Sequence, residues 1–160
     1  MISINKGRNS YNVKSYSTKV NIGVLAKVNN VNIFSNDILI YDNAEVYDNV
    51  DLYYSIEIFG NAKVYNYVKL YNCKIYDNAE VYDNVNIYEN IKIYGNAKIN
   101  HYSYIYAKAK IHGNAKIINS SLECNYIEIF GNALLYKVNV EDAFKLDKIC
   151  GKARLKNLKL

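Results

Sequence analysis

Ile93-Tyr94-Gly95-Asn96-Ala97-Lys98 is one copy of a six-residue unit that recurs along the chain. The unit begins with an aliphatic residue, continues through an aromatic residue, Gly or Asp, Asn and Ala, and usually ends in a charged residue. Strong copies start at Ile40, Ile58, Ile75, Ile93, Ile111 and Ile129, at spacings of 17 or 18 residues. Weaker copies, such as 46–51 and 87–92, lie between them. The unit is therefore six residues long, and three units form a larger period.

This pattern predicts short strands joined by tight corners. In an extended chain, the aliphatic residue and the Ala or Val four positions later point to one side, and the charged residue between them points to the other. The Gly-Asn or Asp-Asn pair favours a corner, because Gly, Asn and Asp tolerate positive φ. The apolar positions do not follow a 3.6-residue period, and β-branched and aromatic residues dominate. Three strands and three corners are expected to form one triangular coil.

The units resemble the hexapeptide repeat of left-handed parallel β-helices, as in IYGNAK at 93–98 and VYDNVN at 81–86. In that family the aliphatic residue points inward and a small residue two positions before it fills the corner. The copies are similar to a subgroup of bacterial and phage proteins labelled as transferases, although an aromatic residue here follows the aliphatic one, where the family usually has a small or polar residue. The resemblance and the periodicity both predict an all-β, single-stranded left-handed parallel β-helix of about seven 18-residue coils.

The repeat also divides the chain. We expect the β-helix over 22–134, an N-terminal cap or arm over 1–21, and degenerate last coils with a C-terminal cap over 135–160. A solenoid has open strand edges at both ends, which such caps would cover. The tail 155–160 alternates apolar and charged residues, so it is also a candidate segment for homodimerisation.

The composition limits the domain size and the cellular compartment that we expect for the protein. The chain has 160 residues, the size of one domain, and 51% hydrophobic residues. Asn, Ile, Lys and Tyr make up half of it, which indicates an AT-rich genome. It contains no apolar run long enough for a membrane span or a secretory signal, so we expect a soluble protein in the bacterial cytoplasm. The three cysteines, Cys73, Cys124 and Cys150, have neither disulfide-framework nor zinc-site spacing.

Stacking at about 18 residues predicts columns of like residues. The position after the aliphatic residue gives three largely aromatic columns: Tyr41, Phe59, Tyr76, Tyr94, His112 and Phe130; Tyr47, Tyr65, Tyr82, Asn100, Ile118 and Tyr136; and Tyr53, Tyr71, Tyr88, Tyr106 and Cys124. These rings either form a stacking platform for a ligand or simply pack on one another. The asparagines at the first corner predict an amide ladder. The alternating Glu45, Lys63, Glu80 and Lys98 predict stacked ion pairs.

Charge varies along the chain. Residues 28–62 contain six acidic and no basic side chains, whereas 90–122 contains five lysines and no acid. Basic groups interleaved with aromatics are typical of a surface that binds an acidic protein or a polyanion. The candidate binding residues are Lys92, Tyr94, Lys98, His101, Tyr102, Tyr104, Tyr106, Lys108, Lys110, His112 and Lys116.

The function expected from these features is binding without catalysis. The resemblance includes trimeric acyltransferases with a histidine base, and a zinc carbonic anhydrase class that needs three histidines; this chain has only His101 and His112. No catalytic residue, metal or cofactor is expected. The expected partner is another protein or a nucleoprotein complex, with direct nucleic-acid contact left open. The expected role is that of a phage or mobile-element inhibitor of a bacterial defence complex of the CRISPR type, which would occlude a nucleic-acid channel or an effector domain. The alternatives are an acyltransferase-like trimer and a structural or polymer-forming scaffold.

Overall fold

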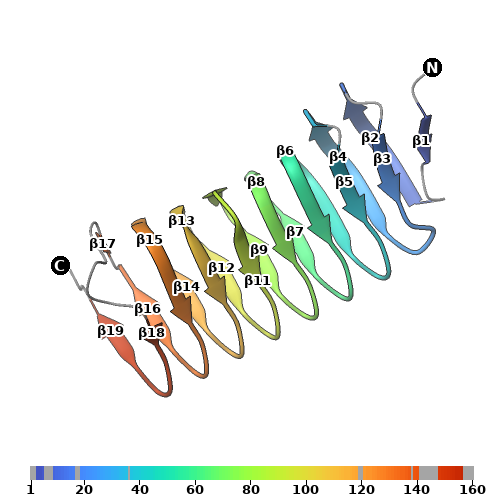
Figure 1. The fold of residues 1–160 in the computed structure, drawn as a ribbon. Coiled ribbons are helices and arrows are strands. Elements are labelled where there is room, and N and C mark those ends of the chain that lie inside the picture. The colour runs from blue at the N-terminus through green and yellow to red at the C-terminus, as the bar shows by residue number, and fades with distance from the viewer. Residues whose placement is uncertain are drawn as a thin grey trace.

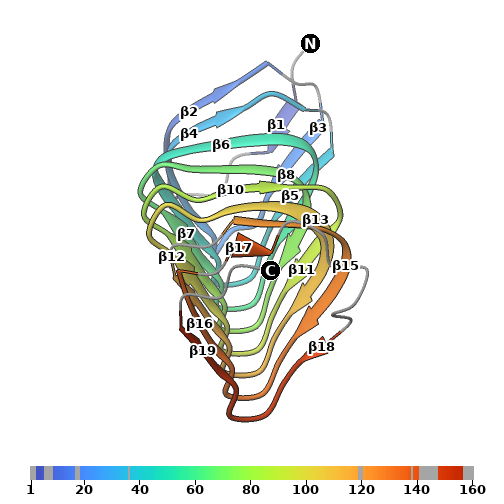
Figure 2. The same cartoon turned by 90° about the vertical axis from the view of Figure 1, so that its left-hand side faces the viewer.

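The computed structural model describes residues 3–5, 9–16, 19–35, 37–118, 121–137, 139–140 and 148–156. Figure 1 shows these residues as a rod of stacked coils, with β1 and β19 at opposite ends. Seen from one end, the coils superpose in a three-sided outline (Figure 2). The described residues contain no helix that could span a membrane.

Every paired strand runs parallel to its neighbours in a single continuous ladder. The strands are β1 (Ser3–Asn5), β2 (Asn9–Ser15), β3 (Lys19–Ile22), β4 (Lys27–Ile33), β5 (Asp37–Ile40), β6 (Glu45–Ile58), β7 (Lys63–Tyr65), β8 (Val68–Ile75), β9 (Glu80–Tyr82), β10 (Asn86–Tyr88), β11 (Ile91–Ile93), β12 (Lys98–Asn100), β13 (Tyr104–Ile111), β14 (Lys116–Ile118), β15 (Ser121–Ile129), β16 (Leu134–Tyr136), β17 (Asn139–Val140), β18 (Lys148–Ile149) and β19 (Arg154–Lys156). Ile75 is in register with Ile93, and Ile93 with Ile111, as the repeat predicts. The predicted parallel β-helix is confirmed.

The ladder has three faces. Face 1 contains β3, β5, β11, β18 and the last residues of β6, β8, β13 and β15. Face 2 contains β7, β9, β12, β14, β16, β19 and the first residues of β6. Face 3 contains β10, β17, the middle of β6 and the first residues of β8, β13 and β15. Corner 1 joins face 1 to face 2, corner 2 joins face 2 to face 3, and corner 3 leads back to face 1.

The core is the column of inward side chains that the repeat predicts. The first residue of each strong copy is fully buried or nearly so, and so is the alanine four positions later, as Ile93 and Ala97 illustrate. Because each buried residue stacks on its counterpart one coil away, the core is a continuous apolar column along the rod. Burial of this column is the main stabilising contribution to such a solenoid.

Corner 1 carries the predicted asparagine ladder. Each amide donates a hydrogen bond from Nδ2 to Oδ1 of the next asparagine, at donor–acceptor distances of 2.9–3.3 Å, through Asn43, Asn61, Asn78, Asn96, Asn114 and Asn132. The residue before each of these asparagines is Gly or Asp, and it has a positive φ, as in Gly95 (70°) and Asp77 (60°). The turn chemistry of the Gly-Asn and Asp-Asn pairs is thereby confirmed.

The aromatic columns stack into ladders. At corner 1, neighbouring rings from Tyr41 to Phe130 lie 4.6–5.2 Å apart between centroids, and their planes are nearly parallel. At the end of face 3 the ladder begins earlier than expected, at Tyr16 and Phe34, and its regular stacking ends at Tyr88. The placement of Cys124 in this column was wrong. Glu123 is in register with Tyr106, because the step between these two residues is 17 rather than 18 residues.

The parallel ladder extends past both expected boundaries of the β-helix. Before residue 22, β1 pairs with β3 and β2 pairs with β4. After residue 134, β16 pairs with β19 and β15 with both β17 and β18. The chain therefore continues to form coils beyond the segment in which corner 1 has the Asn-Ala sequence. The segment expected to dimerise, 155–160, lies outside the described residues from 157 onward, and the capping roles stay predictions.

Candidate functional site

The candidate binding residues encircle the rod. Lys92 and Lys110 lie on face 1, Lys98 and Lys116 on face 2, and Tyr104 and Tyr106 on face 3. Tyr94 and His112 lie at corner 1, His101 and Tyr102 at corner 2, and Lys108 at corner 3. A single flat partner cannot contact all eleven residues at once. The charge-rich window of the sequence therefore contains several smaller surfaces.

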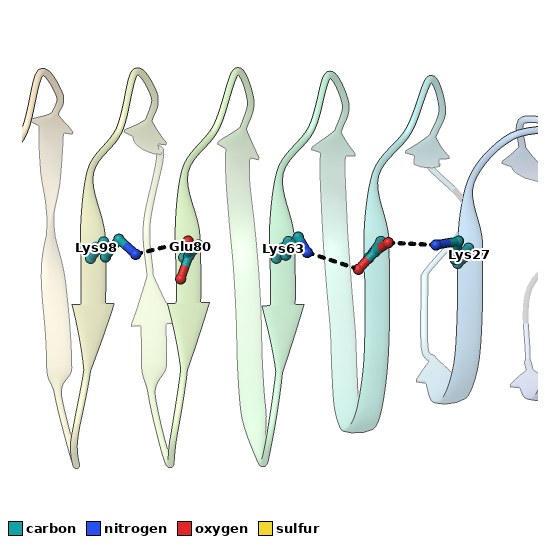
Figure 3. A network of polar contacts seen from close by, with 5 residues as sticks. Lys27, Lys63, Glu80 and Lys98 are labelled. Carbon is teal, nitrogen blue, oxygen red and sulfur yellow. Dashed lines mark hydrogen bonds and ion pairs between the residues drawn. The ribbon is translucent and has the colours of Figure 1, made fainter.

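Face 2 neutralises most of its lysines. Glu45 bridges Lys27 and Lys63, with nitrogen–oxygen distances of 2.7 and 3.2 Å, and Lys98 pairs with Glu80 at 2.9 Å. Figure 3 shows Lys27, Lys63, Glu80 and Lys98 in one row along this face. The hydrogen bond from Lys27 lowers the pKa of the Glu45 carboxyl, and the hydrogen bond to Glu80 raises the pKa of Lys98. The predicted alternation of stacked charges is confirmed on this face. Lys116, the next residue in the column, has no ion-pair partner among the described residues.

Face 1 arranges its charges differently. The outward side chains of three successive coils are Lys74, Lys92 and Lys110, each in direct register with the next. We call these three residues the lysine row. Lys74 pairs with Glu57 at 2.6 Å, at one end of the row. At the other end, Glu128 contacts His112 and Lys148.

No acidic side chain lies within the lysine row. Lys92 is exposed, Lys110 is half-buried, and neither forms an ion pair within the described part of the chain. Neighbouring strands are about 4.8 Å apart, and two ammonium groups at that spacing repel each other by about 1 kcal/mol even in water. Directly opposed like charges destabilise a sheet. Lys108, exposed at the adjoining corner 3, adds a further positive charge beside the row.

The two candidate histidines lie at different corners of the rod. The His112 ring is stacked between Tyr94 and Phe130, and its Nε2 lies 3.3 Å from Oε1 of Glu128. His101 lies at corner 2, where its Nδ1 is 3.4 Å from Oδ2 of Asp83. Among the described residues, no group of three or more His, Cys, Asp and Glu side chains could hold a metal ion.

Three of the four candidate tyrosines, Tyr102, Tyr104 and Tyr106, lie on face 3 and at corner 2 beside it. Tyr102 has a φ of 59° at corner 2 and is 77% exposed. Tyr104 and Tyr106 both tilt by 42° against Tyr88, which ends the regular stacking on that side of the rod. Tyr104 and Tyr106 lie on the same strand as Lys110, but on face 3, across corner 3 from the lysine row.

Lys74 was missed among the candidate residues. It lies outside the window 90–122, but it stands 18 residues before Lys92, as Lys92 stands 18 before Lys110. Arranging outward residues by coil position would therefore have identified the row. Comparisons with protein-family models, with curated proteins and with solved structures give no match.

Proposed function

We propose that this chain is a non-catalytic binding module whose lysine row docks onto an acidic protein surface. The observation that carries the proposal is the contrast between two faces of one molecule. Face 2 alternates acids with lysines through five successive coils, whereas face 1 stacks Lys74, Lys92 and Lys110 with no acid between them. An acidic partner would relieve the repulsion between the lysines of the row, so this repulsion favours the bound state.

The rigidity of the fold supports this proposal. The row is presented on strands whose backbone is hydrogen-bonded on both sides, so binding orders side chains but not the backbone. Electrostatic complementarity of this kind speeds association and selects against basic partners.

The biological role that we propose is the one expected from the sequence. The resemblance to hexapeptide-repeat β-helices of bacteria and phages supports a small rigid binder, and inhibition of a bacterial defence complex of the CRISPR type is the role that such a binder would have there. The partner in this proposal is the protein part of that complex, approached through an acidic surface.

The proposal is tested by reversing charge on one face at a time. Lys92→Glu combined with Lys110→Glu should weaken binding of a fluorescent oligoglutamate peptide at least about tenfold, which corresponds to roughly 1.4 kcal/mol. Fluorescence anisotropy measures the affinity. Lys116→Glu combined with Lys137→Glu is the matched control, because each exchange lowers the net charge by two and both double variants fall from +5 to +1.

Three outcomes would contradict the proposal. Equal losses in both double variants would show a non-specific charge effect. Unchanged binding in the face 1 variant would exclude the lysine row. Oligothymidylate that binds more tightly than oligoglutamate, and is lost in the face 1 variant, would identify a nucleic acid instead of a protein as the partner. Circular dichroism of each variant checks that the β-rich fold is retained.

A further inference from the structure

Beside the lysine row, corner 3 is one residue shorter in one coil than in its neighbours. Tyr53 and Tyr71 are in register, as are Ile56 and Cys73, so two residues turn this corner in one coil and only Asn72 turns it in the next. In the following coil, where Ile91 pairs with Cys73, two residues again turn the corner. This missing residue accounts for the single 17-residue step between strong repeats, from Ile58 to Ile75.

The short corner leaves a hollow between two longer ones. Its volume is about 120 Å³, and it is lined by residues from three successive coils: Ser55 and Glu57; Asn72, Cys73 and Lys74; and Asn90, Ile91 and Lys92. Two members of the lysine row thus line the hollow. Cys73 and Ile91, which are buried core residues, close the hollow on its inner side.

The hollow contains polar groups that have no hydrogen-bond or ion-pair partner in the part of the chain that the structure describes. The Nζ of Lys92 and the side-chain amide of Asn90 form no hydrogen bond or ion pair within the described residues. Oδ1 of Asn72 accepts a hydrogen bond from the backbone N–H of Ser55 at 3.2 Å, which leaves the Nδ2 of Asn72 as a donor. Lys74, by contrast, is already paired with Glu57. Within the described residues, the donors left over are the ammonium of Lys92, the side-chain amide of Asn90 and the Nδ2 of Asn72, and together they suit an anion.

We propose that this hollow is the socket for one carboxylate side chain, an Asp or Glu of the acidic partner; this inference rests on the proposed function and names its central contact. The aliphatic stem of the incoming side chain enters the hollow towards Cys73. Its carboxylate pairs with Lys92 and accepts hydrogen bonds from the amides of Asn72 and Asn90.

The charge of the lining favours a carboxylate over a phosphate group. Glu57 and Lys74 neutralise each other, so Lys92 leaves the hollow with one net positive charge. A monoanion balances that charge. A phosphate monoester carries close to two negative charges at neutral pH, and the second would face the carboxylate of Glu57.

The test uses two small probes that differ only in charge. N-acetyl-glutamate-N-methylamide carries one side-chain carboxylate, and N-acetyl-glutamine-N-methylamide is its neutral analogue. Titration of the ¹⁵N-labelled protein with the glutamate probe should shift the amide resonances of Asn72, Asn90 and Lys92, and the glutamine probe should leave them in place. Equal shifts with both probes, or larger shifts at Lys116 than at Lys92, would overturn the inference. Inorganic phosphate is the third probe, and a tighter fit for phosphate than for the glutamate probe would overturn the assignment to a carboxylate.

The hollow can be closed without altering any charge. Insertion of one serine between Asn72 and Cys73 restores a two-residue corner and an 18-residue coil, as in the neighbouring coils. It should abolish the shifts caused by the glutamate probe and weaken oligoglutamate binding several-fold. Ser55→Tyr, which narrows the hollow from the preceding corner, serves as a second variant and should have the same effect if the insertion disturbs folding.

These variants separate this inference from the proposed function. If the insertion and Ser55→Tyr leave oligoglutamate affinity unchanged while the face 1 charge reversal still weakens it, the socket is wrong and the lysine row stands. If none of these variants changes the affinity, the proposed function itself fails.

Discussion

At the scale of single residues, corner 1 shows why the repeat alternates between Gly and Asp. A Cβ added to Gly113 would lie 2.9 Å from the backbone nitrogen of Gly131, and the φ of Gly113 is 69°. Asp77 tolerates a similar φ at the same corner, and its Oδ2 accepts a hydrogen bond from the N–H of Gly95 at 3.0 Å. Aspartate therefore offsets the strain of its own Cβ by a contact to the next coil, which alanine cannot make.

Exchanges at this corner should separate these two effects. Gly113→Ala should lower the free energy of unfolding by about 2 kcal/mol, through a left-handed non-glycine residue and a close backbone approach. Gly151→Ala should cost only about 1 kcal/mol, because Gly151 has the same φ sign and nothing within 4 Å of an added Cβ. Gly113→Asp should recover part of the loss. Urea unfolding measures all three, and equal costs at Gly113 and Gly151 would show that the packing of the coils is irrelevant there.

At the scale of the structural element, the tyrosine ladders couple stability to alkaline pH. Burial raises the pKa of Tyr65 to about 12, and the nearby carboxylate of Glu80 acts in the same direction. Burial likewise raises the pKa of Tyr41, Tyr47, Tyr53, Tyr71, Tyr76 and Tyr88. When the pKa of a tyrosine is higher in the folded state than in the unfolded state, the difference stabilises the fold at pH values below the unfolded-state pKa. This contribution is lost as the pH rises through the folded-state pKa.

The fold should therefore lose stability between about pH 10, where unfolded tyrosines ionise, and about pH 12. Absorbance at the tyrosinate band should show Tyr65 ionising late, and thermal melts should show the midpoint falling across the same interval. Lysines also titrate there, so Tyr65→Phe is the control: it should flatten the fall in stability without removing the ring stacking. A fall of the same steepness in Tyr65→Phe would assign the effect to the lysine ion pairs instead.

The elements also show which parts of the molecule could be predicted from sequence. The coil, the asparagine ladder and the alternating charges of face 2 were predictable, because each follows from identical residues at one coil position. The lysine row was not identified, because a linear window of charge mixes residues from three faces and omits Lys74. The hollow could not be located either. A 17-residue step shows that a residue is missing, but only the register of Ile56 with Cys73 assigns the shortening to corner 3.

At the scale of the whole molecule, the rod is a one-dimensional stack. The ladder pairs each strand only with the corresponding strands of the preceding and following coils, as Val64 pairs with Val46 before it and Val81 after it. Stability in such a molecule is approximately a sum of coil and interface contributions. One complete coil is therefore removable in principle, provided that the register of the remaining coils is preserved.

Deletion of residues 76–93 provides that test. It removes one 18-residue period, joins Ile75 directly to Tyr94, and places Phe59 against Tyr94 in the corner 1 ladder. The shortened protein should keep its β-rich circular dichroism and unfold cooperatively, with a urea m-value lower by about a tenth because less surface is exposed on unfolding. Deletion of 76–84, which is not a whole number of units, should abolish folding, since it brings inward positions to corners. Folding that tolerates both deletions equally would contradict a register-dependent stack. The first deletion also removes Lys92 and one wall of the hollow, and it brings Lys110 into register with Lys74. The shortened row keeps two of its three lysines, so the folded product should bind oligoglutamate more weakly than the full chain but more tightly than the Lys92→Glu and Lys110→Glu double variant.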